Sequence, residues 1–285
     1  MLSDDTLTIQ PMVAEHLPGA LRLSQAEKWP HRIEDWTLIL NLSKGVVAID
    51  NDEVVATAMT TPFGSVATLN MIIVAERMRG RGLGRKMMER VMRLIEPKEW
   101  RLVATQDGLP LYEKLGFRQT GKILQHQGVV QAPADAEQLA RPGADGLGMA
   151  TSEDLAILAA LDERATGMDR TSLVCELLQV GAIFAIRAAG CIVAFAAVRP
   201  FGRGEVVGPV VAADAGQAHR LLGHILAERA GKFVRVDTEA STGLAPWLSE
   251  HGLAHAGGGI AMRLGPPVPD NGPPYTFALA AQALG

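Results

Sequence analysis

The sequence predicts an α/β protein made of two successive domains, each a mixed, mostly antiparallel sheet flanked by helices. One order of elements occupies residues 1–130 and recurs over 147–285: a strand, two helices, three strands, a helix, a strand, a short helix and a final strand pair. Between them, residues 131–146 are rich in Ala, Pro, Asp and Gly without a sustained period, which predicts a linker. A chain of 285 residues, 48% of them hydrophobic, is long enough for two cores. The repetition indicates a tandem duplication of one fold.

In the first half, apolar periodicity and turn residues define the elements. Asp50-Asn51-Asp52 separates two β-rich runs and suits a hairpin turn, and Pro97 ends the longest helical repeat. We expect a strand at 7–9, helices at 13–26 and 33–42, strands at 45–49, 54–61 and 66–75, a helix at 83–95, a strand at 100–104, a short helix at 109–115, and a strand pair within 117–130 that turns at Thr120-Gly121.

The second half repeats this order. Thr151 to Asp154 form an N-cap ahead of a helix that carries Leu155, Leu158 and Leu161 on one face. We further expect a helix at 169–179, strands at 182–186, 191–198 and 205–211, a helix at 215–229, a strand at 233–237, a short helix at 244–250, a strand pair within 254–264, and one more docked strand at 275–279.

Composition limits the class of protein. A net charge of −4 with 20% charged residues argues against both disorder and general nucleic-acid binding. The N-terminus is acidic and no long apolar run follows it, so we expect neither a signal peptide nor a membrane span, and a cytoplasmic protein. Cys175 and Cys191 lie in apolar contexts, too far apart for a Cys-x-x-Cys motif, and are expected to be buried free thiols.

The segment from Asn70 to Glu96 holds the strongest chemical signal. An apolar strand leads into a loop with Gly80, Gly82 and Gly84, and the loop opens a helix. The first N–H groups of a helix have no backbone partner, and glycines let a ligand approach closely, so this arrangement suits a phosphate. Seven Lys/Arg and one acid, Glu89, lie between residues 77 and 93, although the chain is acidic overall. The alternative is a surface turn with a solvated basic face.

The motif Arg79-x-x-Gly82-x-Gly84 resembles the acetyl-CoA signature of the GNAT (GCN5-related) N-acetyltransferases, Gln/Arg-x-x-Gly-x-Gly/Ala. The spacing is not that of a dinucleotide fingerprint, no Walker lysine follows, and no Gly-x-Ser-x-Gly is present. A second match lies one strand further on. Leu111-Tyr112-x-x-x-Gly116-Phe117 resembles the Leu-Tyr-x-x-x-Gly-Phe signature of the same family. From the residues alone, this run is a short helix ended by a left-handed glycine, with a tyrosine in its middle.

The resemblance implies acetyl-CoA as co-substrate and assigns roles to matching positions. The strand backbone at 72–74 would pair with the pantetheine arm, and an N–H near Val74 would polarise the thioester carbonyl. The loop amides and arginines would hold the pyrophosphate, and Tyr112 would donate the proton to the leaving thiolate. The cofactor-binding residues so implied are Ile72, Ile73, Val74, Arg79, Gly80, Arg81, Gly82, Leu83, Gly84 and Arg85.

Two positions depart from the family pattern, and the base is open. Glu76 stands where proline is frequent, and Thr105 stands where an asparagine usually contacts the cofactor. His31, Glu34 and Asp35 lie in the segment that usually shapes the acceptor pocket, so any of them, or water, is a candidate general base.

The second half lacks these signatures. No glycine pair or arginine cluster follows its third strand, and Leu248 holds the position of the tyrosine. It resembles a degenerate GNAT domain without cofactor, which would wall the acceptor site, dimerise or bind a ligand of its own. The spacings of the histidine pairs His219/His224 and His251/His255 do not favour a metal site, so none is expected.

The sequence thus predicts an acetyl-CoA-dependent N-acetyltransferase that moves an acetyl group to an amine of a small molecule or protein by direct attack on the thioester. A non-catalytic CoA-binding or sensing module is the alternative, and a homodimer is possible in either case. Nucleic acid is not an expected partner, because no aromatic residues are interleaved with the basic cluster. A membrane is not expected as a partner either.

Overall fold

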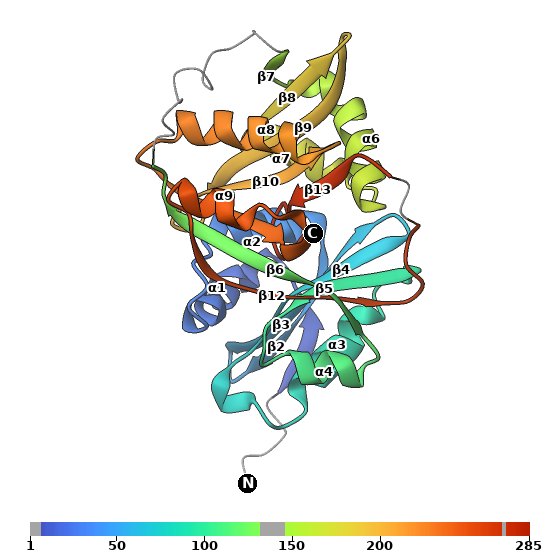
Figure 1. Ribbon diagram of the computed structural model, residues 1–285. Helices are drawn as coiled ribbons and strands as arrows, with labels where there is room; N and C mark the ends of the chain where they lie inside the picture. Colours follow the sequence, from blue (N-terminus) through green and yellow to red (C-terminus); the bar gives the residue numbers. More distant parts are fainter. Residues whose placement is uncertain (1–6, 132–145, 270–271) are drawn as a thin grey trace.

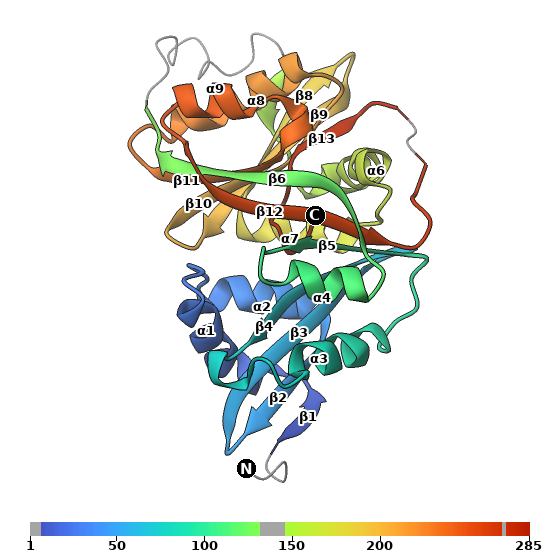
Figure 2. The ribbon, with the colours of Figure 1, turned by 60° about the horizontal axis from the view of Figure 1, so that its bottom comes forward.

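The computed structural model describes residues 7–131, 146–269 and 272–285. Its strands form one continuous, twisted sheet that runs through both halves in the order β1-β2-β3-β4-β5-β12-β6-β11-β10-β9-β8-β7, with β13 paired to β10 (Figures 1 and 2). Most neighbouring strands are antiparallel, and helices cover the sheet. The expected fold class is confirmed.

The first half follows the expected order of elements. The turn between β2 and β3 places Asn51 and Asp52 at φ of 49° and 62°, as a tight hairpin requires. Its elements are β1 (Thr8–Pro11), α1 (Leu17–Ala26), α2 (Ile33–Leu42), β2 (Lys44–Asp50), β3 (Glu53–Phe63), β4 (Val66–Val74), α3 (Leu83–Met92), β5 (Glu99–Ala104), α4 (Leu109–Lys114) and β6 (Arg118–Val129), with short 3-10 turns at Ala14–His16 and Glu76–Met78.

The second half repeats these elements and adds one strand. They are β7 (Leu147–Met149), a 3-10 turn at Ser152–Asp154, α6 (Leu155–Thr166), α7 (Thr171–Val180), β8 (Ala182–Ala188), β9 (Cys191–Phe201), β10 (Gly204–Ala212), α8 (Ala215–Glu228), β11 (Phe233–Glu239), a 3-10 turn at Ala240–Thr242, α9 (Ala245–Glu250), β12 (Ala254–Leu264) and β13 (Tyr275–Ala278). The strand expected at 275–279 is therefore present.

The two expected strand pairs at the ends of the halves are wrong. Each is a single long strand, and the partner comes from the other half: β12 pairs with β5 and β6, and β6 also pairs with β11. Thr120-Gly121 is not a turn, because Gly121 lies within β6 opposite Ala261 of β12. β6 and β12 run side by side across the centre of the molecule (Figures 1 and 2). This reciprocal exchange joins the halves through backbone hydrogen bonds.

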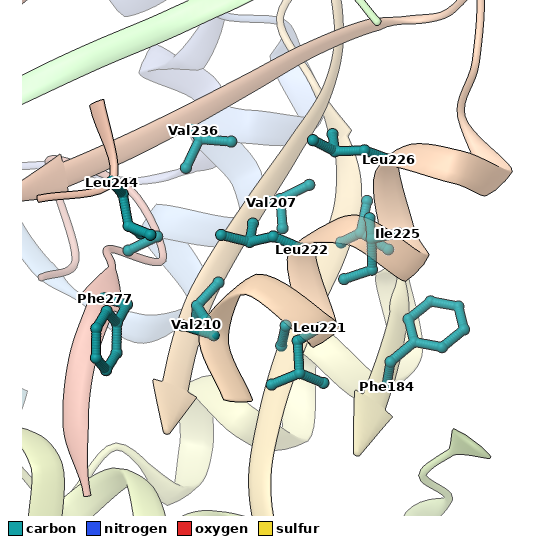
Figure 3. Close-up of a cluster of buried hydrophobic side chains, with 14 of the residues drawn as sticks. Phe184, Val207, Val210, Leu221, Leu222, Ile225, Leu226, Val236, Leu244 and Phe277 are labelled. Carbon is teal, nitrogen blue, oxygen red and sulfur yellow. The ribbon is translucent and has the colours of Figure 1, made fainter. Parts of the chain in front are cut away.

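A core forms under a helix of each half, and a further core joins Leu38, Phe63 and Val66 of the first half to apolar residues of the second. In the first half, α3 packs Leu83, Met87, Met88 and Val91 onto the sheet. In the second half, α8 packs Leu221, Leu222, Ile225 and Leu226 against β8, β9 and β10 (Figure 3). A residue at every third or fourth position lines one helix face, which explains why the sequence shows both helices clearly.

Some expectations fall outside the described residues or are corrected. The linker expected at 131–146 lies almost wholly in residues 132–145, outside the described part of the chain, so the boundaries 1–130 and 147–285 stay predictions. Both cysteines are free, but Cys191 is exposed and Cys175 only half-buried, so their expected burial is wrong. Cys191 begins β9 directly after a surface turn, which accounts for its exposure. In the described residues, no helix has the length and apolar character needed to cross a membrane.

Candidate functional site

The candidate site begins where β4 and β5 diverge. The two strands pair in parallel only from Val66 to Thr68 of β4. Beyond this point β4 carries an irregularity at Met71, whose φ is 49° and whose carbonyl oxygen accepts a hydrogen bond from Thr57 Oγ1 (2.7 Å). The N–H of Ala75 donates to Val55 on β3 at 2.8 Å. Because the ladder alternates, the N–H of Val74 points away from β3, into the angle between β4 and β5.

The glycine loop leads from β4 into α3 with its amides exposed. Gly80 and Gly82 have φ of 75° and 76°, a conformation that side chains with a Cβ rarely adopt. Gly82 is the N-cap of α3 and provides no side-chain cap, and the first helical bond recorded is from Lys86 N–H to Gly82 O (3.1 Å). In the described chain, the N–H groups of residues 83–85 therefore have no acceptor. Such a helix start binds an anion well.

The arginines around this loop divide into braced and free groups. Arg79 donates from Nε to the carbonyl oxygen of Val74 (3.0 Å) and forms an ion pair with Glu27, so its side chain ties the loop to the end of α1. Arg85 pairs with Glu89 at 2.9 Å within α3. Arg81 has no carboxylate partner among the described residues. The loop thus keeps unpaired positive charge beside its free amides.

Tyr112 lies in α4 with its ring buried between the loop before the helix and Phe117. A Cβ on Gly108 would come within 2.9 Å of the ring, and the Phe117 ring meets it edge-on at 6.2 Å. Burial raises the pKa of Tyr112 to about 12, so the phenol keeps its proton at neutral pH. Thr105 caps the turn before α4, because its hydroxyl accepts from Gly108 N–H at 3.2 Å.

A cavity of about 330 Å³ opens beside β4 and β5 at the junction of the halves. The first half contributes the segment before α2, the irregular part of β4, the end of β5 and β6. The second half contributes the turn between β9 and β10, β11, β12 and the C-terminal segment. We name this space the acceptor cavity; its lining residues are Lys28, Trp29, Pro30, His31, Leu69, Asn70, Met71, Val103, Thr105, Gln125, Gln127, Arg203, Arg235, Ala256, Gly258, Gln282 and Ala283.

The structure separates the three candidate bases. His31 lines the acceptor cavity, and its Nδ1 is buried without a hydrogen-bond partner. Burial lowers its pKa to about 4, so it is neutral at pH 7. Asp35 is buried instead and bound by Arg32 (2.9 Å) and by the N–H of Gly202 (3.1 Å), which fixes the second half against α2. Glu34 is exposed and lines a different cavity.

The second half has the same arrangement of strands and helices, but another strand fills the angle that is open in the first half. β10 and β11 pair in parallel over 205–207 and then diverge, but β13 pairs with β10 in the angle between them. Leu279 N–H also donates to Asp237 O (2.8 Å), and the Thr238 hydroxyl donates to Phe277 O (2.6 Å), so this segment is bonded to β11 as well. Leu248 holds the fourth position of α9, as Tyr112 does in α4, and is fully buried.

The helix that follows β10 is capped by its own side chains. Asp214 is the N-cap of α8 and accepts from Gln217 N–H at 2.9 Å, while Gln217 Oε1 accepts from Ala213 N–H at 3.0 Å. The first bond satisfies one N–H of the first helical turn, that of Gln217, and the Asp214 carboxylate places a negative charge where an anion would bind. No cluster of three metal-ligating His, Cys, Asp or Glu side chains occurs in the described part of the chain.

Sequence reasoning missed the contribution of the second half to the cavity. Arg203, Arg235 and Gln282 carry no motif and lie more than a hundred positions from the β4 residues 69–71 that line the same cavity. The sequence carries no sign of the strand exchange that brings β11 and β12 next to the first half.

Comparisons with known proteins find the same duplication. Profiles described as "Acetyltransferase (GNAT) domain" match residues 41–119 and residues 158–273. A curated relative, the uncharacterised N-acetyltransferase YitH of Bacillus subtilis (strain 168), is 27% identical over 95% of this chain and 96% of its own length.

Solved structures share the fold of the whole chain. A putative acetyltransferase from Pyrococcus horikoshii superposes with a TM-score of 0.82 at 17% identity, covering 100% of this chain and 98% of that one. A tandem GNAT protein from the clavulanic acid biosynthesis pathway gives a TM-score of 0.61 at 14% identity, covering 92% of this chain and all (100%) of that one. The tandem arrangement is therefore shared along the full length.

Proposed function

Because the chain belongs to the GNAT acetyltransferase family, with one such domain in each half, we propose that its first half transfers the acetyl group of acetyl-CoA to an amine bound in the acceptor cavity. The family makes the chain an acyltransferase that uses an amine acceptor. The proposal adds the site, the roles of the residues and the direct attack of the amine on the thioester.

The free amides at the start of α3 would hold the diphosphate of the co-substrate. Three consecutive N–H groups without acceptors and the positive end of the helix favour that charge, and Arg81 adds a cation that is not already paired. Arg79 acts differently: its contacts to Glu27 and Val74 hold the loop in shape. The pantetheine arm would run from there along the open edge of β4 at residues 72–74.

The chemical step needs a neutral amine, a polarised carbonyl and a proton for sulfur. The amine nitrogen attacks the thioester carbon, the N–H of Val74 stabilises the negative charge on the carbonyl oxygen, and the C–S bond breaks. Tyr112 donates its proton to the departing sulfur, and the phenol is available as a donor because it is protonated at neutral pH. The proton from the amine passes to water or to the neutral His31 in the cavity wall.

One observation carries the proposal: the open edge of β4 connects an uncapped helix start with a cavity large enough for a small acceptor. The second half offers no such path, because β13 fills its angle and Asp214 caps its helix.

Replacing Tyr112 with Phe tests the assignment. The variant removes only a hydroxyl that forms no hydrogen bond within the described part of the chain, so we expect kcat to fall about a thousandfold while the Kd for acetyl-CoA changes less than about twofold. Release of CoA from acetyl-CoA in the presence of an amine panel measures kcat, and calorimetry measures Kd.

Tyr275→Phe is the matched control, because Tyr275 is the other tyrosine of the chain and lies half-exposed on β13. It should leave both constants unchanged. Full turnover in Tyr112→Phe would remove Tyr112 as the proton donor, and failure of the unaltered chain to bind acetyl-CoA would overturn the proposed function.

A further inference from the structure

The acceptor cavity is positively charged although the chain as a whole is acidic. Its charged lining residues are Lys28, Arg203 and Arg235, and no carboxylate of the described residues lines it. The chain as a whole carries a net charge of −4, so the positive lining is a local feature. A cavity whose only charges are cationic selects anionic groups and repels cations.

The three cations differ in how free they are. Arg235 is bound by Asp237, with Nε and the terminal nitrogen 2.9 and 3.1 Å from its carboxylate oxygens, so its charge is compensated. Arg203 lies with its guanidinium 5.1 Å from the centre of the Phe233 ring and has no carboxylate partner in the described chain. Lys28 is also exposed and unpaired among the described residues. Arg203 and Lys28 are therefore available to a ligand.

The position of Arg203 is built into the contact between the halves. It lies in the turn between β9 and β10, directly after Gly202, whose N–H donates to Asp35 of α2 (3.1 Å). Arg32, next to the cavity residue His31, donates to Pro200 O at 3.0 Å in the same strand region. Hydrogen bonds on both sides of the turn thus hold it against the first half. They fix the backbone from which Arg203 faces the cavity.

We infer that the acceptor is an amine that also carries an anionic group, a carboxylate or a phosphate, and that Arg203 of the second half binds that group. This inference rests on the proposed function. Charge-assisted hydrogen bonds from a guanidinium are strong and directional for both kinds of anion. The same positive surroundings favour the neutral, reactive form of the amine over its protonated form. Cationic polyamines and lysine-rich protein tails are disfavoured.

Matched pairs of acceptors test this inference. Glucosamine 6-phosphate against glucosamine examines phosphate, an α-amino acid against its carboxamide examines carboxylate, and spermidine serves as the cationic amine. We expect the anionic member of at least one pair to have a kcat/KM about tenfold above its uncharged match, and spermidine to be the poorest acceptor. Calorimetry of the same compounds with CoA-saturated protein measures binding without turnover.

Arg203→Ala should lower the ratio of kcat/KM between anionic and uncharged partners by about tenfold, mainly through KM, and Arg203→Glu should invert it. Arg118→Ala, at an exposed arginine near the start of β6 and away from the cavity lining, is the control and should leave the ratio unchanged.

The inference is overturned if no anionic amine reacts or binds better than its uncharged match, or if Arg203→Ala leaves the ratio unchanged. A different result would overturn the proposed function. It predicts that the chain binds acetyl-CoA and that turnover of whichever amine reacts depends on Tyr112.

Discussion

The two halves share one framework and differ in whether its central angle is open. In the first half, β4 diverges from β5 and its edge faces the acceptor cavity, whereas in the second half β13 bonds to both β10 and β11 in the corresponding angle. α3 begins with free amides and α8 begins with a capping aspartate. The comparison teaches that two copies of one fold can differ in whether the edge of the third strand has a partner, and under our proposal only the open copy binds acetyl-CoA.

A substitution at the start of α3 is expected to have the largest effect on the difference between the two halves. Gly82→Asp gives α3 the capping residue of α8, places a carboxylate where the diphosphate would bind, and forces a side chain into a backbone with φ of 76°. We expect acetyl-CoA affinity to fall at least about a hundredfold, or about 3 kcal/mol, by calorimetry.

The reciprocal variant is the matched control. Asp214→Ala should reduce the free energy of unfolding by about 1 kcal/mol through loss of the cap. It should create no second acetyl-CoA site, because β13 still fills the angle beside β10. Gain of a second site would show that the cap alone separates the halves.

A substitution at the contact between the two halves is expected to have the next largest effect at neutral pH. Asp35 accepts from Arg32 and from Gly202 N–H, and lies 3.6 Å from buried Arg199. These hydrogen bonds hold the pKa of Asp35 below its usual value against the opposing effect of burial. Asp35→Asn keeps the shape but removes the charge, so we expect a loss of about 2 kcal/mol in urea unfolding.

Because Gly202 precedes Arg203, Asp35→Asn should also raise KM for anionic acceptors. Unchanged stability and unchanged KM together would mean that this contact does not position the second half.

A pH series distinguishes the segments before α2 and α7. The folded pKa of His31 is about 4 and the unfolded value is 6.5, so the unfolded chain binds the proton first and stability falls as pH drops from 6.5 to 4. Asp169 holds the corresponding place before α7, and hydrogen bonds from Thr171 lower its pKa below 3.8, so its effect lies at lower pH.

His31→Gln should therefore reduce the loss of unfolding free energy between pH 6.5 and 4 by about 2.5 kcal/mol, as measured by urea titration. Asp169→Asn should leave the loss in that window unchanged. Equal slopes for the unaltered chain and His31→Gln would contradict the neutral state of His31.

Local elements were predictable from the sequence because each depends on neighbouring residues. The apolar spacing of α3, the Asp50-Asn51-Asp52 turn and the left-handed Gly116 after α4 all appear where expected. The glycine loop between β4 and α3 was predictable for the same reason, because its motif consists of neighbouring residues. Whether each loop residue contacts acetyl-CoA stays a prediction, and the bracing role of Arg79 became visible only with Glu27 in place.

Strand partners were not predictable. The sequence of β6 favours a strand whether its neighbour follows in the chain or comes from the other half, so a hairpin was expected where β12 lies. The cavity wall formed by Arg203 and Arg235 depends on that exchange and was missed with it.

A crystal structure of the chain with acetyl-CoA would test the central claim most directly. The account predicts one molecule per chain, its diphosphate at the N–H groups of residues 83–85 and its pantetheine arm along β4, with β13 still paired to β10. A molecule bound between β10 and β11 with β13 displaced, or none along β4, would contradict it.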